Sequence, residues 1–120
     1  MTGGVYIHIP FCRRKCDYCN FYSVPLECFP GDAAIPEWYI RRLSDEIRHR
    51  LPAAGFSSAD TVYLGGGTPS LMTAGQAEVL LGLVRQNVTL EPGAEITLEM
   101  NPGDVFAESL AGFRDAGVNR

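Results

Sequence analysis

Three short apolar runs divide the chain, and a longer amphipathic segment follows each of them. The runs are "VYIHI" (Val5–Ile9), "TVYL" (Thr61–Leu64) and "EITLEM" (Glu95–Met100), and they are rich in β-branched and aromatic residues. Short runs of this kind, ended by proline, glycine or asparagine, are typical of buried strands. The pattern therefore predicts three strands.

The segments between and after these runs have the spacing of amphipathic helices. The first occupies residues 36–52 between two prolines, the second begins at a capping box of Thr73 and Gln76, and the third is capped by Asp104 and ended by Gly117. Their predicted apolar faces are Ile40, Leu43, Ile47 and Leu51; Ala77, Leu80, Leu81, Val84 and Val88; and Phe106, Leu110 and Phe113.

Alternating strands and helices predict an α/β fold with a parallel sheet and right-handed crossovers. The chemically unusual residues lie where the strands end: cysteines after the first, glycines after the second and Glu99 near the end of the third. In α/β folds, ligands bind at the carboxyl ends of the strands. We therefore expect these residues to meet at one site.

Three strand–helix units are too few for a closed (β/α) barrel, which takes on the order of 200 or more residues. A further strand is expected shortly after Gly117, yet the sequence reaches Arg120 there. We therefore predict that residues 1–120 are the N-terminal portion of a larger domain.

Three cysteines stand close together in "PFCRRKCDYCNF", at Cys12, Cys16 and Cys19. A structural zinc site needs four ligands, and the remaining candidates, Cys28 and two isolated histidines, do not supply a second pair at a usual spacing. An iron–sulfur cluster with one iron left open fits the spacing better. Zinc, as in an interaction module without redox chemistry, stays open as an alternative.

Composition and charge are those of an ordinary globular protein, with 46% apolar residues and a net charge of -4. The negative charge argues against a nucleic-acid surface. We find neither a secretory leader nor a transmembrane segment, so we expect a cytoplasmic protein whose thiols stay reduced.

Motifs in four regions of the chain, in the same order, resemble one family. "CRRKCDYC" has the CxxxCxxC signature of the radical S-adenosylmethionine (radical SAM) superfamily, and "LGGGTPS" resembles its glycine-rich motif. "VYIHIPFC", "ITLEMNPGD" and "AGVNR" are similar to the branch that contains oxygen-independent coproporphyrinogen III oxidases and radical SAM heme chaperones. The resemblance implies the start of a partial (β/α) TIM-type barrel.

Phe21 separates the two members of that branch. The oxidases typically have a further cysteine at this position, in CxxxCxxCxC. The substitution favours a heme chaperone, which binds heme and passes it to apoproteins. The alternative implied by the resemblance is oxidative decarboxylation of coproporphyrinogen.

The resemblance also assigns residues and cofactors. Cys12, Cys16 and Cys19 are expected to bind three irons of a [4Fe–4S] cluster whose fourth iron binds S-adenosylmethionine, the source of a 5′-deoxyadenosyl radical. The expected S-adenosylmethionine pocket consists of Tyr6, Tyr18, Gly66, Gly67, Thr68 and Glu99. Heme or a porphyrinogen is the expected second ligand, and a flavodoxin-type protein is a candidate electron donor.

Several of these residues also have a structural explanation. A tyrosine in a strand commonly belongs to the core, glycines suit a tight strand-to-helix turn, and Glu99 could be a surface acid at a strand end. His8 has the same strand parity as Tyr6 and should point to the same side. Residues 13–15 are basic and fit a solvated loop, and Cys28 has no counterpart in the family.

Overall fold

The computed structural model describes residues 1–13, 24–26, 34–104 and 106–120. Three parallel strands form the main sheet in the order β1 (Thr2–Ile9), β4 (Ser58–Gly66) and β5 (Thr89–Leu98). The short β2 (Phe11–Cys12) and β3 (Val24–Pro25) pair in parallel beside it. This arrangement confirms the predicted α/β class.

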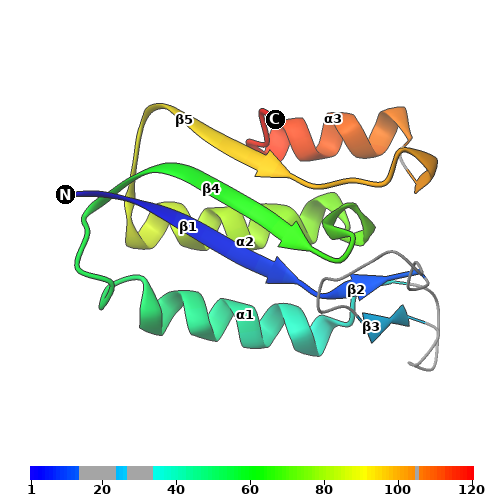
Figure 1. Cartoon of the computed structure of the whole chain (residues 1–120), viewed down its shortest axis with the longest axis horizontal. Coiled ribbons are helices and arrows are strands. Elements are labelled where there is room, and N and C mark those ends of the chain that lie inside the picture. Colours follow the sequence, from blue (N-terminus) through cyan, green and yellow to red (C-terminus); the bar gives the residue numbers. More distant parts are fainter. Residues whose placement is uncertain (14–23, 27–33, 105) are drawn as a thin grey trace.

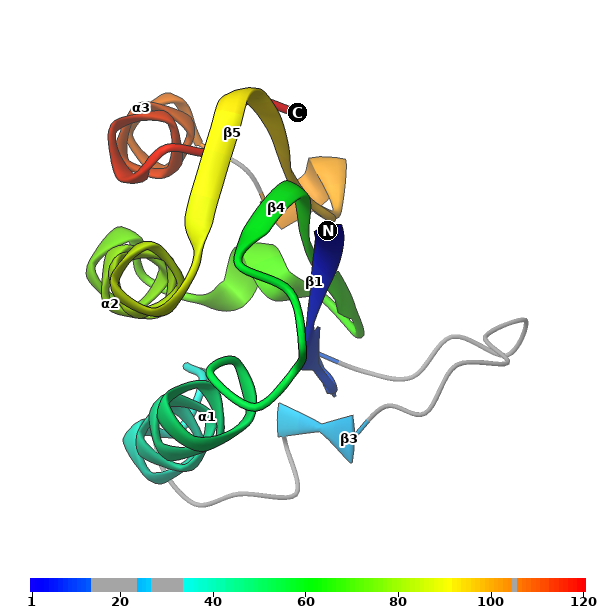
Figure 2. The ribbon, with the colours of Figure 1, turned by 90° about the vertical axis from the view of Figure 1, so that its left-hand side faces the viewer.

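Three helices cover one face of the main sheet (Figures 1 and 2). They are α1 (Glu37–Arg50), α2 (Ala74–Asn87) and α3 (Ala107–Ala116). α2 lies between the other two and packs against both. Two 3-10 turns, η2 (Pro69–Leu71) and η3 (Pro102–Asp104), connect a strand to the helix after it.

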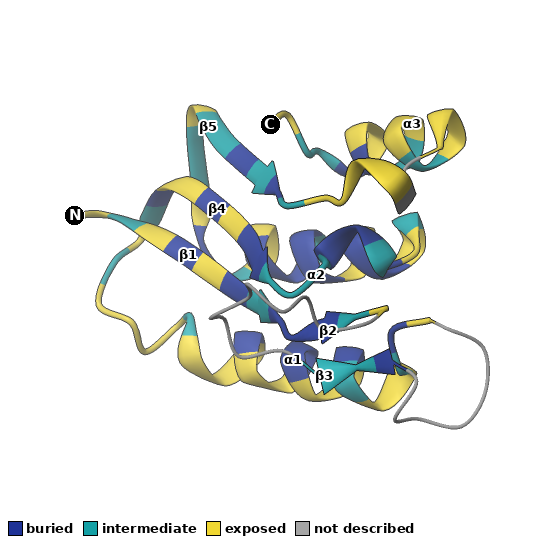
Figure 3. Cartoon of the chain, turned by 45° about the vertical axis from the view of Figure 1, so that its right-hand side comes forward, coloured by how far each residue is buried: buried dark blue, intermediate teal, exposed yellow. Residues whose placement is uncertain are grey.

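The core lies between the sheet and the helices. Successive side chains of a strand point to opposite faces, so one set from each strand is buried under the helices (Figure 3): Val5, Ile7 and Ile9; Val62 and Leu64; Ile96 and Leu98. Among the described residues no helix covers the other face of the sheet, and Tyr6 and Tyr63 lie exposed on it. The described sheet therefore has one face covered by helices and one face without them, which we call the open face.

The first two helices follow the sequence closely. Pro36 is the N-cap residue of α1, and Thr73 and Gln76 form the predicted capping box of α2. Of the apolar face expected for the first helix, Leu51 is only half-buried, because α1 ends at Arg50 and Leu51 is its C-cap residue. Periodicity thus placed both helices to within a residue or two.

The third helix starts later than predicted. Asp104 belongs to the turn η3 and is not the cap; α3 begins after Phe106. The turn is set by Asn101, whose Oδ1 accepts the backbone N–H of Gly103 at 3.2 Å. Of the apolar stripe expected for this helix, Phe113 is buried, but Phe106 and Leu110 are exposed. Gly117 ends the helix as predicted, in the left-handed conformation (φ 113°).

After α3 the chain returns to the free edge of β5. The backbone N–H of Arg120 donates to the carbonyl of Ile96 at 3.1 Å, and the N–H of Leu98 donates to the carbonyl of Arg120 at 2.9 Å. In a parallel ladder, one residue bonds to two residues of the neighbouring strand that are two positions apart, as Arg120 does with Ile96 and Leu98. The last residues of the sequence therefore pair with β5 in parallel. Across the described ranges, no helix has the length and apolar character of a membrane span.

Gln76 links the N-terminus of α2 to the N-terminus of α1, so its substitution tests how these two helices pack. Its buried side-chain amide donates to the carbonyl of Ile35 at 3.1 Å and to the Glu37 carboxylate at 2.9 Å. We expect Gln76→Ala to lower the free energy of unfolding by about 1–3 kcal/mol, because the carbonyl of the buried residue Ile35 loses its donor and the capping box is lost. Gln86→Ala, on the exposed side of α2, should stay within about 0.5 kcal/mol. Urea denaturation followed by circular dichroism measures both, and equal effects would contradict the assigned role.

Candidate cluster and cofactor site

The carboxyl ends of the three main strands lie at one edge of the sheet (Figure 1). Cys12 follows β1, the glycines end β4, and Glu99 directly follows β5. The pairing of His8 with Gly65 and of Ile9 with Gly66 brings the first two segments alongside each other. The structure thus confirms the predicted convergence for the residues that it describes.

The glycine segment packs directly against the backbone that leads to Cys12. The N–H of Gly67 donates to the carbonyl of Ile9 at 2.8 Å, and the N–H of Thr68 donates to the carbonyl of Phe11 at 2.7 Å. A Cβ atom on Gly67 would lie 2.5 Å from the Phe11 carbonyl oxygen. The close approach of the two backbones therefore requires glycine at position 67.

Thr68 contacts the first cysteine of the motif. Its hydroxyl donates a hydrogen bond to the Cys12 sulfur, with Oγ1 and Sγ 3.6 Å apart. The two main-chain hydrogen bonds just described fix the backbone positions from which both side chains extend. A hydroxyl donor stabilises a thiolate, and hydrogen bonds to cluster sulfurs are among the factors that set a cluster's reduction potential.

The two preceding glycines leave room for side chains on the open face. Gly66 has a φ of 115°, and a Cβ there would lie 2.7 Å from the His8 ring. A Cβ on Gly65 would lie 2.6 Å from Cε1 of Tyr63 and 3.0 Å from Oε1 of Glu99. The glycine motif is therefore fitted to its neighbours at all three positions.

A row of polar aromatic side chains crosses the open face from β1 to β5. The Tyr6 hydroxyl and His8 Nδ1 are hydrogen-bonded at 3.0 Å. The Tyr6 and Tyr63 rings stack with their centroids 5.9 Å apart. The Tyr63 hydroxyl in turn donates to Oε1 of Glu99 at 2.6 Å. His8 does share a side with Tyr6, as its parity predicts. Tyr6 is thus a residue of the open face and not of the core.

Both phenols titrate above their ordinary range. Partial burial, followed by the negative charge of Glu99, raises the pKa of Tyr6. The hydrogen bond to Glu99 is the largest cause that raises the pKa of Tyr63. At neutral pH Tyr63 is therefore protonated and acts as the donor to the Glu99 carboxylate.

The described part of the site contains six of the nine residues predicted for it. Cys12, Tyr6, Gly66, Gly67, Thr68 and Glu99 all lie at or beside the strand-end edge. Cys16, Tyr18 and Cys19 lie outside the described residues, as do Phe21 and Cys28. Within the described ranges, no three His, Cys, Asp or Glu side chains form a group that could hold a metal ion.

Sequence reasoning missed one residue of this arrangement, Tyr63. It was assigned only to the strand "TVYL", without a role. Its alternation with Val62 and Leu64 places it on the same face as Gly65, and this parity was a readable signal. The partner across the sheet, Tyr6, could be identified only from the observed register.

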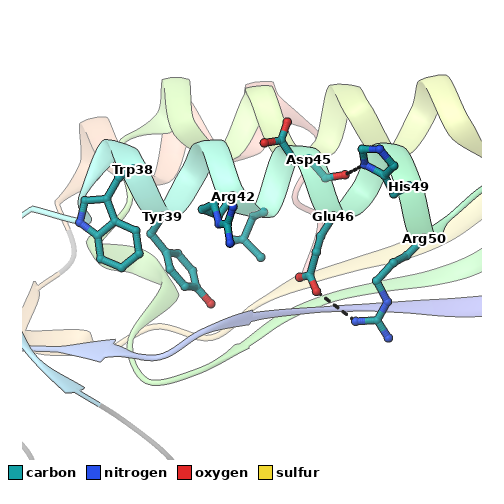
Figure 4. Close-up of a pocket in the computed structure, with 8 residues that line it drawn as sticks. Trp38, Tyr39, Arg42, Asp45, Glu46, His49 and Arg50 are labelled. Atoms are coloured by element: carbon teal, nitrogen blue, oxygen red, sulfur yellow. Dashed lines mark hydrogen bonds and ion pairs between the residues drawn. The ribbon is translucent and has the colours of Figure 1, made fainter.

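Hollows of the molecule border α1. One of about 520 Å³ follows the outer side of α1, lined by residues that include Trp38, Glu46 and Arg50 (Figure 4). Glu46 and Arg50 pair across it at 3.3 Å. None of the predicted site residues lines it. A second hollow, of about 780 Å³, lies between α1 and β1 and reaches Tyr6 and His8.

The described residues fit an iron–sulfur cluster with an organic cofactor beside it. Cys12 supplies a partly exposed thiol of the type that binds iron in such clusters. Gly66 and Gly67 are half-buried and lie beside the segment that carries this thiol, and Glu99 adds a carboxylate that can accept hydrogen bonds. This donor set fits both groups.

Comparison with known proteins agrees with this chemistry. Residues 6–120 match the sequence profile of the radical SAM superfamily. The chain belongs to the radical SAM superfamily. Membership implies a [4Fe–4S] cluster and S-adenosylmethionine as the groups that the domain binds.

The relatives of this radical SAM chain include proteins of both expected kinds. It is 39% identical over 117 residues to the heme chaperone HemW of Escherichia coli and 37% identical over 120 residues to the mitochondrial radical S-adenosyl methionine domain-containing protein 1 of Mus musculus. The solved structure of coproporphyrinogen III oxidase (HemN) from Escherichia coli is similar with a TM-score of 0.82 and 29% identity. Each comparison covers 98% of this chain, which spans 30%, 26% and 26% of the three proteins, respectively. The fold is that of the N-terminal part of the HemN barrel.

Two glycine-to-alanine substitutions test the close contact at the site. Gly67→Ala should lower the free energy of unfolding by about 1–3 kcal/mol, because its Cβ would overlap the Phe11 backbone. Gly82→Ala is the control: it lies inside α2 with no atom within 4 Å of the added Cβ, so it should raise stability by about 0.5–1 kcal/mol. Denaturant titrations decide, and a stable Gly67→Ala protein would contradict the close approach.

Proposed function

We propose that this chain is the N-terminal portion of the core domain of a radical SAM heme chaperone. In this proposal Cys12, Cys16 and Cys19 bind a [4Fe–4S] cluster, and S-adenosylmethionine binds beside it at the strand-end edge. The full-length protein binds heme and transfers it to apoproteins in the cytoplasm. The observation that supports the site most directly is the hydrogen-bonded contact between the glycine segment and the backbone before Cys12.

The chain's own residues divide the work of binding. Cys12 supplies one thiolate, and Thr68 donates a hydrogen bond to it. Gly66 and Gly67 leave main-chain groups accessible to a cofactor, while Tyr6 offers a ring and hydroxyl and Glu99 a carboxylate that accepts hydrogen bonds. When bound, the cluster and S-adenosylmethionine supply one-electron radical chemistry, for which a flavodoxin-type donor is the proposed reductant.

Two observations favour the chaperone over the oxidase. HemW chaperones from several bacteria match the chain at 32–39% identity. Phe21 stands where the oxidases typically have an additional cysteine. The similarity to the HemN structure keeps oxidative decarboxylation of coproporphyrinogen as the second candidate function.

The cluster assignment is tested by replacing one cysteine at a time. After anaerobic reconstitution with iron and sulfide, Cys16→Ala should lose the [4Fe–4S] cluster, because two protein thiolates cannot hold three irons. Cys28→Ala is the matched control and should keep the iron content of the unmodified protein. Iron and sulfide analysis with visible absorbance measures both. Full iron content in Cys16→Ala, or colourless protein with stoichiometric zinc, would contradict the assignment.

The choice of ligand is tested on the full-length protein. We expect it to bind heme and to release it to an apoprotein acceptor, and to leave coproporphyrinogen unchanged under reducing, anaerobic conditions with S-adenosylmethionine. Heme transfer is followed by absorbance and the porphyrin products by chromatography. Conversion of coproporphyrinogen with loss of two carboxyl groups would replace the chaperone with the oxidase.

A further inference from the structure

Tyr63 lies between two residues proposed to contact S-adenosylmethionine. Its ring stacks on Tyr6 at a centroid distance of 5.9 Å and an interplanar angle of 24°. Its hydroxyl donates to Glu99 at 2.6 Å. One side chain from the central strand thus contacts a side chain from each outer strand.

The sheet register fixes this arrangement. Tyr6 is the direct partner of Tyr63 across the β1–β4 ladder. The backbone N–H of Glu99 donates to the carbonyl of Leu64 at 3.0 Å, which places Glu99 beside the end of β4. Because Tyr63 precedes Leu64, its side chain points to the open face, where the carboxylate of Glu99 lies.

The first glycine of the motif is matched to this pair. Gly65 has no φ in the left-handed region, so backbone conformation does not explain the glycine. The explanation is space, because an added Cβ would approach the Tyr63 ring to 2.6 Å and Glu99 Oε1 to 3.0 Å. The glycine motif therefore accommodates the Tyr63–Glu99 contact as well as the cysteine segment.

We infer that Tyr63 is a positioning residue for S-adenosylmethionine, acting through Glu99 and Tyr6. Without the phenol, the Glu99 carboxylate has no fixed donor on this face among the contacts described for it, and its side chain can adopt other rotamers. The Tyr63 hydroxyl holds the carboxylate in one orientation before the cofactor binds, which lowers the ordering cost of binding. This inference rests on the proposed function, because it presumes that the cofactor binds at this edge.

A double-mutant cycle on the reconstituted full-length protein separates positioning from general damage. Tyr63→Phe keeps the ring and removes the hydroxyl, and it should weaken S-adenosylmethionine binding by roughly 3- to 10-fold, because a hydrogen bond to a charged group is lost. In a Glu99→Ala background the same substitution should change the affinity less than about twofold, since its partner is already gone. The readout is the change in the cluster's electron paramagnetic resonance spectrum as S-adenosylmethionine is added.

Tyr39→Phe is the matched control. It also removes a phenol hydrogen bond, from the Tyr39 hydroxyl to the carbonyl of His8 at 2.7 Å, but it lies on α1. It should keep both the iron content and the S-adenosylmethionine affinity. Iron content must also be unchanged in Tyr63→Phe, which shows that the site has assembled.

Three outcomes would overturn the inference: unchanged affinity in Tyr63→Phe, an equal loss in both backgrounds, or an equal loss in Tyr39→Phe. The proposed function fails differently. In that case the unmodified protein assembles no [4Fe–4S] cluster, or the spectrum of its cluster does not respond to S-adenosylmethionine.

Discussion

The site depends on the approach of two backbones just beyond the ends of β1 and β4. The parallel ladder does not stop with the strands: Gly67 and Thr68 continue it by donating to the carbonyls of Ile9 and Phe11. This continuation needs a residue without a side chain at position 67, since a Cβ would overlap the Phe11 backbone. Because of these hydrogen bonds, the sheet fixes the position of the backbone at the start of the cysteine motif. The proposed cluster ligand Cys12 and the glycine segment proposed to contact the cofactor are thereby joined through their backbones.

The open face of the sheet explains why polar aromatic residues occur in strands that are otherwise apolar. All-parallel sheets are generally covered on both faces, and their strands then consist of nearly continuous apolar runs. Here the helices cover one face. Tyr6, His8 and Tyr63 lie on the other face, and along each strand they alternate with residues that are buried under the helices. In a (β/α) barrel the face opposite the helices is the interior, where strand side chains meet in layers. The alternation is therefore what a barrel strand requires when its interior contains a polar site.

The sequence predicted the main strands and helices, and its misses have physical reasons. Strand and helix positions follow from short-range periodicity, and the capping box at Thr73 is a local signal that the structure reproduces. Asp104 was misassigned because a turn fixed by Asn101 took up the residues where a helix start was expected. Tyr63 was missed because its two contacts depend on how the strands pair. It pairs with Tyr6 of β1 and donates a hydrogen bond to Glu99, which follows β5. Local patterns identify elements, whereas contacts between strands must be observed.

The two ends of the glycine motif contact different neighbours. At one end Gly65 makes room for the Tyr63–Glu99 pair on the open face; at the other, Thr68 donates to the sulfur of Cys12. Between them, the N–H of Gly67 donates to the carbonyl of Ile9 at the end of β1. Hydrogen bonds to cluster sulfurs change the reduction potential, so in the proposed function the Thr68 hydroxyl would contribute to the potential of the cluster.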